Sequence, residues 1–454
     1  MTDAVKTVAA YYHRLNNGGA EKVMANLANI WIASGYRVIL FTDDEPSDDD
    51  YFINKNAVRI ILPKYTPEIS HKDRADALVK AIETYDIDIY INHAWENPYV
   101  MKDVNIMKKH GIPVSVYAHG SFAYMLSWPS ATYFTMPEIL GSYDGIICLS
   151  RVDQLYWSTY CKYVKKVINP ISVEVNRTNN FARDSSEIQL IWVGRLEFRK
   201  GYLDLISVME QVIQRYPNAI LHIVGAINEN DYNLSFEKSI VEKNLQNNII
   251  LEGYHKDISA YYQSSDIFVM TSVAEGFCLG LLESKAYSLP AVVYDLPNLE
   301  MHIENKGMIK VEPYDTRSMA DAICSLIEND SLRGRLSEEA YKSYSEYENI
   351  NQGEIWDKIF NDIIKGNDTP SIPDERQIRK NMLDTLRFYM KMGADNLKSN
   401  YIQTVNQQHS EITRLSGEVS RLTDNVEWYR NSTSYRIGRK ITRFPGMIKH
   451  FVKR

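Results

Sequence analysis

The chain has 454 residues, of which 44% are hydrophobic and 24% are charged, as is typical of a globular protein with two or three domains. Residues 430–454 contain eight Lys or Arg and no acidic residue, whereas residues 1–429 contain 43 basic and 58 acidic side chains. An acidic body with a basic tail argues against general nucleic-acid binding and predicts a local anionic contact at the tail.

The cysteines and the start of the chain indicate a compartment. Cys148, Cys161, Cys278 and Cys324 are scattered without metal-ligand spacing, which favours a reduced, cytoplasmic environment. The first residues lead directly into an apolar strand, so we expect no signal peptide. No run of about 18 apolar residues occurs, so we expect no membrane span.

The first part of the chain, residues 1–175, alternates short apolar runs with helix-length segments. This pattern predicts parallel strands joined by helices in a doubly wound α/β sheet. The expected strands are Val8–Leu15, Val38–Thr42, Val58–Leu62, Ile87–Asn92, Val114–Ala118, Gly145–Leu149 and Lys166–Ile168.

A glycine-containing loop joins the first strand to a helix expected over Glu21–Ser34. Gly18 and Gly19 would let the backbone approach a ligand, and Glu21 suits the positive end of the helix. A plain structural turn is the alternative. The acidic loop Asp43–Asp50 is expected to be a solvated spacer rather than a metal site.

His119 follows the strand Val114–Ala118 and therefore lies at the carboxyl edge of the predicted sheet. From position alone, a structural histidine and a functional one are both open. The aromatic segment Tyr124–Phe134, with Trp128 and Pro129, is either a substrate-side loop or a buried connection.

A polar linker, Asn176–Glu187, precedes a second series of strands within residues 188–345. These residues are expected to form a second Rossmann-like domain. Its expected strands are Gln189–Val193, Ile220–Val224, Ile249–Leu251, Ile267–Met270, Ala291–Tyr294 and Met308–Val311.

The first strand of this second domain ends in Gly194-Arg195, and Lys200-Gly201 follows five residues later. Both cations then lie where a strand's carboxyl end meets the next helix, which is the usual ligand edge of an open α/β sheet. As isolated residues they would be ordinary surface charges. Together they can neutralise a diphosphate.

The central stretch of the chain runs from the strand Ile267–Met270 through a turn into a helix expected over Leu279–Ser288. Such a turn points backbone N–H groups at an anion. Glu275 and Glu283 flank it, and carboxylates beside a phosphate site are better suited to accept hydrogen bonds from sugar hydroxyls. This combination suits a nucleotide-sugar. Each glutamate alone would more simply be a surface or ion-paired residue.

In their order, these motifs resemble the family 4 retaining glycosyltransferases of the two-Rossmann-domain (GT-B) architecture. The resemblance covers roughly residues 5–365 and rests on Gly-Gly-Ala-Glu near the start, Gly-Arg-(x)4-Lys-Gly, Ser-(x)2-Glu-Gly-Phe and the two glutamates separated by seven residues. It implies two α/β domains that face each other across a cleft, with a helix in residues 346–366 that crosses back to the first domain. Residues 284–290 and 295–300 depart from the family pattern, which bears on sugar selectivity rather than phosphate binding.

The resemblance also implies a site. Its expected catalytic residues are Arg195, Lys200, Glu275 and His119, with His119 facing the donor sugar and not acting as a general base. Its expected donor-binding residues are Gly18, Gly19, Gly194, Gly225, Tyr254, Phe277, Cys278, Leu279, Gly280 and Glu283. Neither a metal nor another cofactor is expected, because the nucleoside-diphosphate-sugar is a co-substrate and its leaving diphosphate assists acceptor deprotonation.

The C-terminal part begins with a linker, residues 367–377, and continues as a helical segment, residues 378–430. Its apolar residues recur at spacings of three and four, a pattern typical of a coiled coil and hence of an oligomer. The repeating residues are Ile402, Val405, His409, Ile412, Leu415, Val419, Leu422, Val426 and Tyr429. The alternative is one helix packed on its own catalytic body.

The basic tail, residues 431–454, mixes Arg and Lys with Tyr, Ile and Phe. Such a segment can lie on an anionic membrane surface, and it resembles the ends of bacterial enzymes that build surface polysaccharides on lipid carriers. A disordered, solubilising tail is the alternative. We therefore expect a cytoplasmic protein, peripheral on the inner face of the membrane.

The function expected from the sequence is retaining transfer of a sugar from a nucleoside-diphosphate-sugar to a hydroxyl of a growing, lipid-linked surface glycan. Alternatives are a non-catalytic scaffold of a polysaccharide-assembly complex and a nucleotide-sugar epimerase of the same fold. A metal-dependent transferase is disfavoured because its Asp-x-Asp match, Asp86-Ile87-Asp88, flanks the start of a strand. A dehydrogenase is disfavoured because no Gly-x-Gly-x-x-Gly follows the first strand. The sequence does not specify the sugar, the acceptor or the oligomer number.

Overall fold

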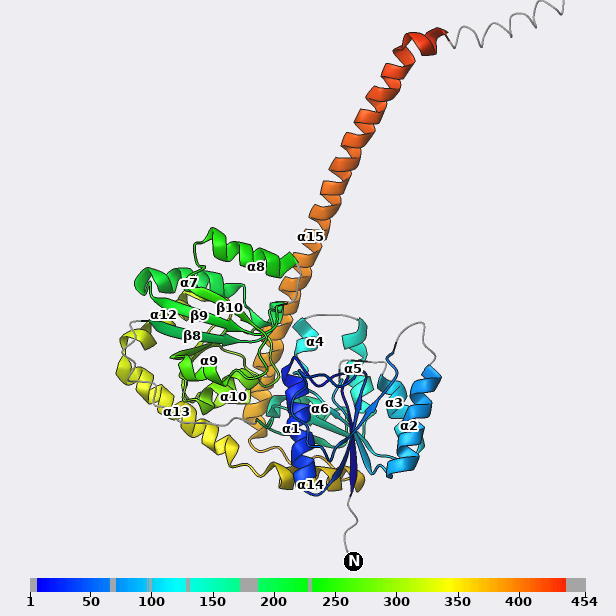
Figure 1. Ribbon diagram of the computed structural model, residues 1–454, viewed down its shortest axis with the longest axis vertical. Coiled ribbons are helices and arrows are strands. Elements are labelled where there is room, and N and C mark those ends of the chain that lie inside the picture. Colours follow the sequence, from blue (N-terminus) through cyan, green and yellow to red (C-terminus); the bar gives the residue numbers. More distant parts are fainter. Residues whose placement is uncertain are drawn as a thin grey trace, which may run out of the picture. The chain divides into compact units, whose positions relative to one another are not determined.

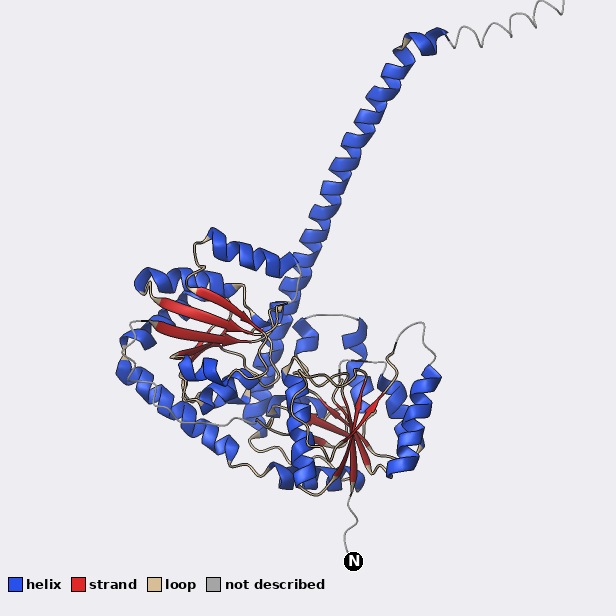
Figure 2. Cartoon of the chain, viewed as in Figure 1, coloured by secondary structure: helices blue, strands red, loops and turns tan. Residues whose placement is uncertain are grey.

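A computed structural model describes residues 6–65, 71–95, 97, 100–127, 131–171, 187–227 and 231–437. The chain divides into two compact units, Met1–Tyr389 and Met390–Arg454. The first unit contains two parallel sheets flanked by helices, and Figure 2 shows their strands as two separate groups. The expectation of two Rossmann-like domains with a C-terminal helical extension is therefore confirmed.

The first sheet has seven parallel strands in the order β3-β2-β1-β4-β5-β6-β7. Its interior strand β1 is buried along its whole length, as expected for a parallel strand covered by helices on both faces. The strands are β1 (Thr7–Tyr11), β2 (Arg37–Thr42), β3 (Val58–Ile61), β4 (Ile89–Asn92), β5 (Val114–Tyr117), β6 (Gly145–Cys148) and β7 (Val164–Lys166). The helices of this part are α1 (Gly19–Ala33), α2 (His71–Tyr85), α3 (Met101–Lys109), α4 (Tyr124–Ser127), α5 (Ala131–Gly141) and α6 (Arg151–Trp157) (Figure 1).

The second sheet has six parallel strands in the order β10-β9-β8-β11-β12-β13. They are β8 (Ile188–Val193), β9 (Ala219–Val224), β10 (Ile249–Gly253), β11 (Ile267–Met270), β12 (Ala291–Tyr294) and β13 (Met308–Val311). The intervening helices are η3 (Phe198–Lys200), α7 (Asp204–Arg215), α8 (Asp231–Glu242), α9 (Ser259–Ser264), α10 (Leu279–Ala286), α11 (Glu300–Glu304), α12 (Thr316–Glu328) and α13 (Asp330–Glu348).

The helix after α13 packs on the first domain. Trp356 and Phe360 of α14 (Gln352–Ile364) are fully buried and contact Trp31 of α1 edge-on, with ring centroids 5.2 and 5.6 Å from it. Lys6 Nζ also donates to Asn361 Oδ1 at 2.8 Å. These contacts bring residues far apart in the sequence into the core of the first domain.

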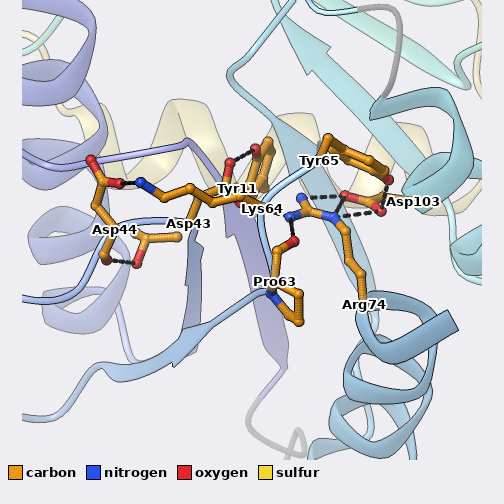
Figure 3. Close-up of polar contacts among 9 residues, drawn as sticks. Tyr11, Asp43, Asp44, Pro63, Lys64, Tyr65, Arg74 and Asp103 are labelled. Carbon is orange, nitrogen blue, oxygen red and sulfur yellow. Dashed lines mark hydrogen bonds and ion pairs between the residues drawn. The ribbon is translucent and has the colours of Figure 1, made fainter. Parts of the chain in front are cut away.

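A buried ion cluster fixes the loops that follow β2 and β3 (Figure 3). Arg74 is 2% exposed and donates to Asp103, which is 1% exposed, from Nη2 to Oδ2 at 2.7 Å. The same guanidinium reaches Asp43 Oδ1 at 2.6 Å and the Pro63 carbonyl at 2.9 Å. The rings of Tyr65 and Tyr11 lie 4.3 and 4.9 Å from it.

This cluster refines the expectation of a solvated acidic loop over Asp43–Asp50: residues 45–49 are exposed as expected, whereas both ends of the loop are ion-paired. Asp43 is partly buried and bound to Arg74, and Asp50 pairs with Arg59. Arg59 and Arg74 lie in a strand and a helix that follow the loop, so the loop is anchored at both of its ends.

The C-terminal helix α15 runs from Glu375 to Asn431. It therefore begins two residues after Pro373, inside the segment 367–377 that was expected to be a linker. Glu375 places a carboxylate in its first turn, where the helix dipole favours negative charge. Helix is found over the segment predicted to be helical, whereas a coiled coil remains a prediction. Residues 438–454, most of the basic tail, lie outside the described residues.

Candidate functional site

A cavity of about 810 Å³ lies between the two domains, at the carboxyl ends of strands from both sheets. Every residue that the sequence analysis assigned to the site lines it. The first domain contributes Gly18, Gly19 and His119, and the second contributes Gly194, Arg195, Lys200, Gly225, Tyr254, Glu275, Phe277, Cys278, Leu279, Gly280 and Glu283. Gly18 and Glu283, from opposite ends of this set, therefore meet in one place.

Lys200 and Glu275 form the central ion pair of this cavity. Lys200 Nζ lies 2.6 Å from Glu275 Oε1, and the two side chains are 18% and 7% exposed. Ser272 Oγ donates to the same oxygen at 2.7 Å, and Asn298 Nδ2 donates to the Glu275 main-chain carbonyl at 2.8 Å. Lys200 and Ser272 therefore bind the same carboxylate oxygen while Asn298 fixes the backbone of Glu275, and the carboxylate orients the ammonium group of Lys200.

Arg195 and Arg199 share one carboxylate, Glu197. Arg195 Nε lies 3.0 Å from Glu197 Oε1, and Arg199 Nε lies 2.8 Å from Oε2. Burial acts to raise the pKa of Glu197, but the two guanidinium groups outweigh it and hold that pKa below its usual value. Glu197 was not among the predicted site residues. Its spacing, two residues from each arginine, was the available signal.

Glu283 forms an ion pair with a lysine of the first domain. Its Oε1 lies 2.6 Å from Lys22 Nζ of α1, and its Oε2 accepts from Tyr262 Oη at 3.0 Å. A second pair across the domains joins Arg151 Nε to Glu300 Oε2 at 2.9 Å. Lys22 could not be predicted from its local sequence, because its partner lies 261 residues away.

Two glycines allow the domains to approach. A β-carbon on Gly276 would lie 2.1 Å from the carbonyl oxygen of His119, a distance that no real contact shows. One on Gly19 would lie 3.2 Å from Leu279 Cδ1. The turn that carries Glu275 thus packs directly on the strand end that carries His119, and any side chain at position 276 would separate them.

His119 and Cys278 are both uncharged in this site. Burial lowers the pKa of His119 to about 3, so the ring stays neutral at physiological pH. Burial, with a smaller contribution from Glu275, raises the pKa of the Cys278 thiol to about 12, so Cys278 is not a thiolate nucleophile. Cys278 precedes α10 with a φ of 66°.

Comparison with known proteins assigns both domains. Residues 176–343 match the family Glycosyl transferases group 1, and residues 17–169 match Glycosyltransferase Family 4. The chain therefore carries both domains of a GT-B glycosyltransferase. This confirms the expected enzyme class.

Individual relatives agree with this class. The glycosyltransferase is 24% identical over 73% of its length to an uncharacterized glycosyltransferase of Haemophilus influenzae, of which it covers 92%. It is 27% identical over 40% of its length to a poly(glycerol-phosphate) alpha-glucosyltransferase of Bacillus subtilis, but spans 27% of that enzyme. A TarM mutant of S. aureus, crystallised with Fondaparinux, alpha-GlcNAc-glycerol and UDP, shares its fold with a TM-score of 0.63 at 14% identity, covering 79% of this chain and 100% of that one.

The Asp-x-Asp sequence of the glycosyltransferase, residues 86–88, lies away from the cavity. Asp88 precedes β4 and accepts from the Thr7 main-chain N–H at 2.7 Å, at the amino end of the sheet. Within the described residues, no three His, Cys, Asp or Glu side chains are placed to hold a metal ion. Nor is any helix in the described part both long enough and apolar enough to cross a membrane. Trp128 and Pro129 lie outside the described residues.

Proposed function

We propose that the protein transfers a sugar, with retention of anomeric configuration, from a nucleoside-diphosphate-sugar to a hydroxyl of a growing, lipid-linked bacterial surface glycan. The observation that carries this proposal is the gathering of Lys200, Arg195, Glu275 and Glu283 in one interdomain cavity. The two cations suit the diphosphate of such a donor. The two carboxylates suit the hydroxyl groups of its sugars.

In this proposal Lys200 and Arg195 stabilise the charge that develops on the departing diphosphate. Both are already oriented by carboxylates, Lys200 by Glu275 and Arg195 by Glu197. Preorganised cations need little rearrangement as the bond to the sugar breaks, which is where electrostatic catalysis gains most. The diphosphate itself then assists removal of the acceptor's proton, with no metal required.

Glu275 and the backbone from Phe277 to Gly280 are proposed to hold the donor sugar, and Glu283 the ribose hydroxyls. Glu283 is buried and already accepts two hydrogen bonds from Lys22 and Tyr262, which fixes its position. The nucleotide base is proposed to lie along the edge formed by Gly225 and Tyr254. UDP in the S. aureus TarM structure supports a nucleoside diphosphate as the leaving group.

Glu283→Gln is expected to raise KM for the donor about ten- to a hundredfold and to change kcat less. A hydrogen bond to a charged group is worth roughly 1.5–3 kcal/mol, and the ribose lies away from the bond that breaks. Steady-state kinetics with the preferred donor measure both constants. Glu346→Gln, which removes a carboxylate from an exposed pair with Lys306, is the matched control. An unchanged donor KM in Glu283→Gln would contradict the ribose assignment.

The acceptor and location are proposed from relatives and from the tail. Poly(glycerol-phosphate) and amylovoran transferases among the relatives act in bacterial polymer synthesis by their names. The basic residues of 430–454 suit an anionic bilayer surface, where each contributes about 1 kcal/mol of attraction. We therefore place the enzyme at the inner face of the membrane, bound peripherally.

The apolar stripe of α15 is proposed to form a coiled coil with a second copy of the chain. Five members of the stripe are 45–62% exposed: Ile412, Leu415, Val419, Leu422 and Val426. From residue 412 to residue 426, β-branched residues take position a and Leu takes position d, an arrangement that favours two parallel strands. In that alignment Glu418 faces Thr423 of the second copy and Asn425 faces Arg430, so no like charges meet. We therefore propose a parallel homodimer that brings two basic tails to one end.

Leu415→Glu/Leu422→Glu is expected to convert a dimer into a monomer, because two charges would be buried in successive core layers. Light scattering after gel filtration of the full-length protein should give twice 52.4 kDa for the wild type and 52.4 kDa for the variant. Ser420→Glu, on the outer face of the same helix, is the control and should stay dimeric. A wild-type monomer or trimer would contradict the parallel dimer.

The proposed transfer is tested by incubating the protein with a labelled donor and lipid extracted from bacterial membranes. The label should move into the lipid fraction, and the anomeric proton of the product should show by NMR the same configuration as the donor. Inverted configuration would contradict retention. Label released only as a free sugar epimer, without transfer to lipid, would favour the epimerase alternative.

A further inference from the structure

A second histidine lies behind His119. His93 follows β4, and its Nδ1 is 3.0 Å from Nε2 of His119. Both rings contact Tyr117: the His93 ring stacks on it at 5.0 Å and 11°, and the His119 ring at 4.5 Å and 28°. The Tyr117 hydroxyl is itself anchored on Asn169 Oδ1 at 2.6 Å. The two imidazoles are thus fixed in position and orientation.

The hydrogen bond between these rings requires one proton, and the proton can belong to either ring. If His119 donates from Nε2, then Nδ1 of His93 accepts and the neutral His93 carries its proton on Nε2. If His93 donates from Nδ1, its Nε2 carries only a lone pair. The surroundings of His93 Nε2 therefore decide between the two arrangements.

His93 is fully buried, and within the described part of the chain its Nε2 has no hydrogen-bond partner. A buried N–H without an acceptor is rarer and costlier than an acceptor with an unused lone pair. The arrangement with the lone pair on Nε2 is therefore favoured. It leaves His119 protonated on Nδ1, the nitrogen for which the described residues offer no protein partner.

We infer that His93 is a positioning residue that locks His119 into the tautomer with an N–H donor on Nδ1, directed to the ligand in the interdomain cavity. The inference deepens the proposed function and rests on it for the nature of that ligand. His119 then donates a hydrogen bond to a sugar oxygen and has no free lone pair with which to accept a proton. The site selects a donor sugar with a hydroxyl oxygen at this point.

This arrangement requires both imidazole rings to be uncharged, and burial keeps them uncharged. Burial lowers the pKa of His119 to about 3, and burial together with the neighbouring His119 holds the pKa of His93 well below its usual value. Neither ring gains a second proton at physiological pH, so the tautomer does not change across the working range.

The direct test is ¹⁵N NMR of the full-length, histidine-labelled protein without any donor. Among ten histidines, His119 is assigned by the signals lost in His119→Phe. Its Nδ1 should resonate as a protonated nitrogen and its Nε2 as an unprotonated one. In His93→Phe, which keeps a flat ring against Tyr117 but removes the donor, both His119 nitrogens should show tautomer exchange. Protonation of Nε2 in the wild type, or an unchanged tautomer in His93→Phe, would overturn the inference.

Kinetics provide the second readout. His93→Phe should lower kcat/KM about tenfold, the value of one lost neutral hydrogen bond, with an unchanged melting temperature. His93→Asn, whose amide can donate to His119 Nε2, should restore most of the loss. Equal loss in both variants, with the fold intact, would contradict a role through the donated hydrogen. Because the NMR result needs no turnover, it separates failure of this inference from failure of the proposed transferase function.

Discussion

Lys200→Ala is expected to lower kcat about 100- to 1,000-fold while the protein stays folded. Removing one preorganised group that stabilises transition-state charge has an effect of this size. Lys200 Nζ lies 2.6 Å from Glu275, which stands on the turn that binds the donor in our proposal. The measurement is initial-rate kinetics at saturating donor, with circular dichroism as the check of the fold.

The matched control is Lys306→Ala. Lys306 also lies 2.6 Å from a carboxylate, Glu346, but both side chains are 40% or more exposed and lie outside the cavity. This variant should keep the wild-type rate, because an exposed pair far from the cavity serves neither binding nor chemistry. A wild-type rate in Lys200→Ala would remove Lys200 from the catalytic assignment.

Arg74→Met should lower the free energy of unfolding by roughly 3–5 kcal/mol, the largest stability effect that we expect from one substitution. Methionine fills most of the space but leaves Asp103, which is 1% exposed, without its cation. An uncompensated buried charge has a cost of this order. Asp43 would lose its cation as well and keep only the hydrogen bond from the Tyr11 hydroxyl, so the loop after β2 would loosen (Figure 3).

Urea denaturation followed by circular dichroism measures this change. Arg215→Met is the control, because Arg215 pairs with Asp321 and Glu328 on the surface and its removal should hardly alter stability. A loss in Arg74→Met no larger than in Arg215→Met would show that Asp43 and Asp103 do not depend on Arg74.

The strands could be located from the sequence because parallel strands are buried on both faces and appear as continuous apolar runs. Ile267–Met270 and Ala291–Tyr294 were predicted at their observed bounds. The prediction Lys166–Ile168 was two residues late, since β7 is Val164–Lys166. That strand lies at the sheet edge with one partner, β6, so burial marks its bounds less clearly.

The cavity residues could be predicted because they follow strands, and the carboxyl ends of parallel strands meet at one edge. The ion-pair partners of these residues could not be predicted. Lys22 reaches Glu283 only through the contact of two domains, and Asp43 finds Arg74 across 31 residues. A charge without a local partner is expected to be solvated, which is why the ion pairs at both ends of the acidic loop were not predicted. His93 was missed because its role depends on a neighbour in another strand.

The most direct test of the proposed activity is release of nucleoside diphosphate from a panel of nucleotide-sugars by the purified full-length protein in EDTA. We predict release from one donor, stimulated by membrane lipid extract and abolished in Lys200→Ala. If the folded protein releases nucleoside diphosphate from none of the donors, the result would contradict a transferase and favour a non-catalytic scaffold.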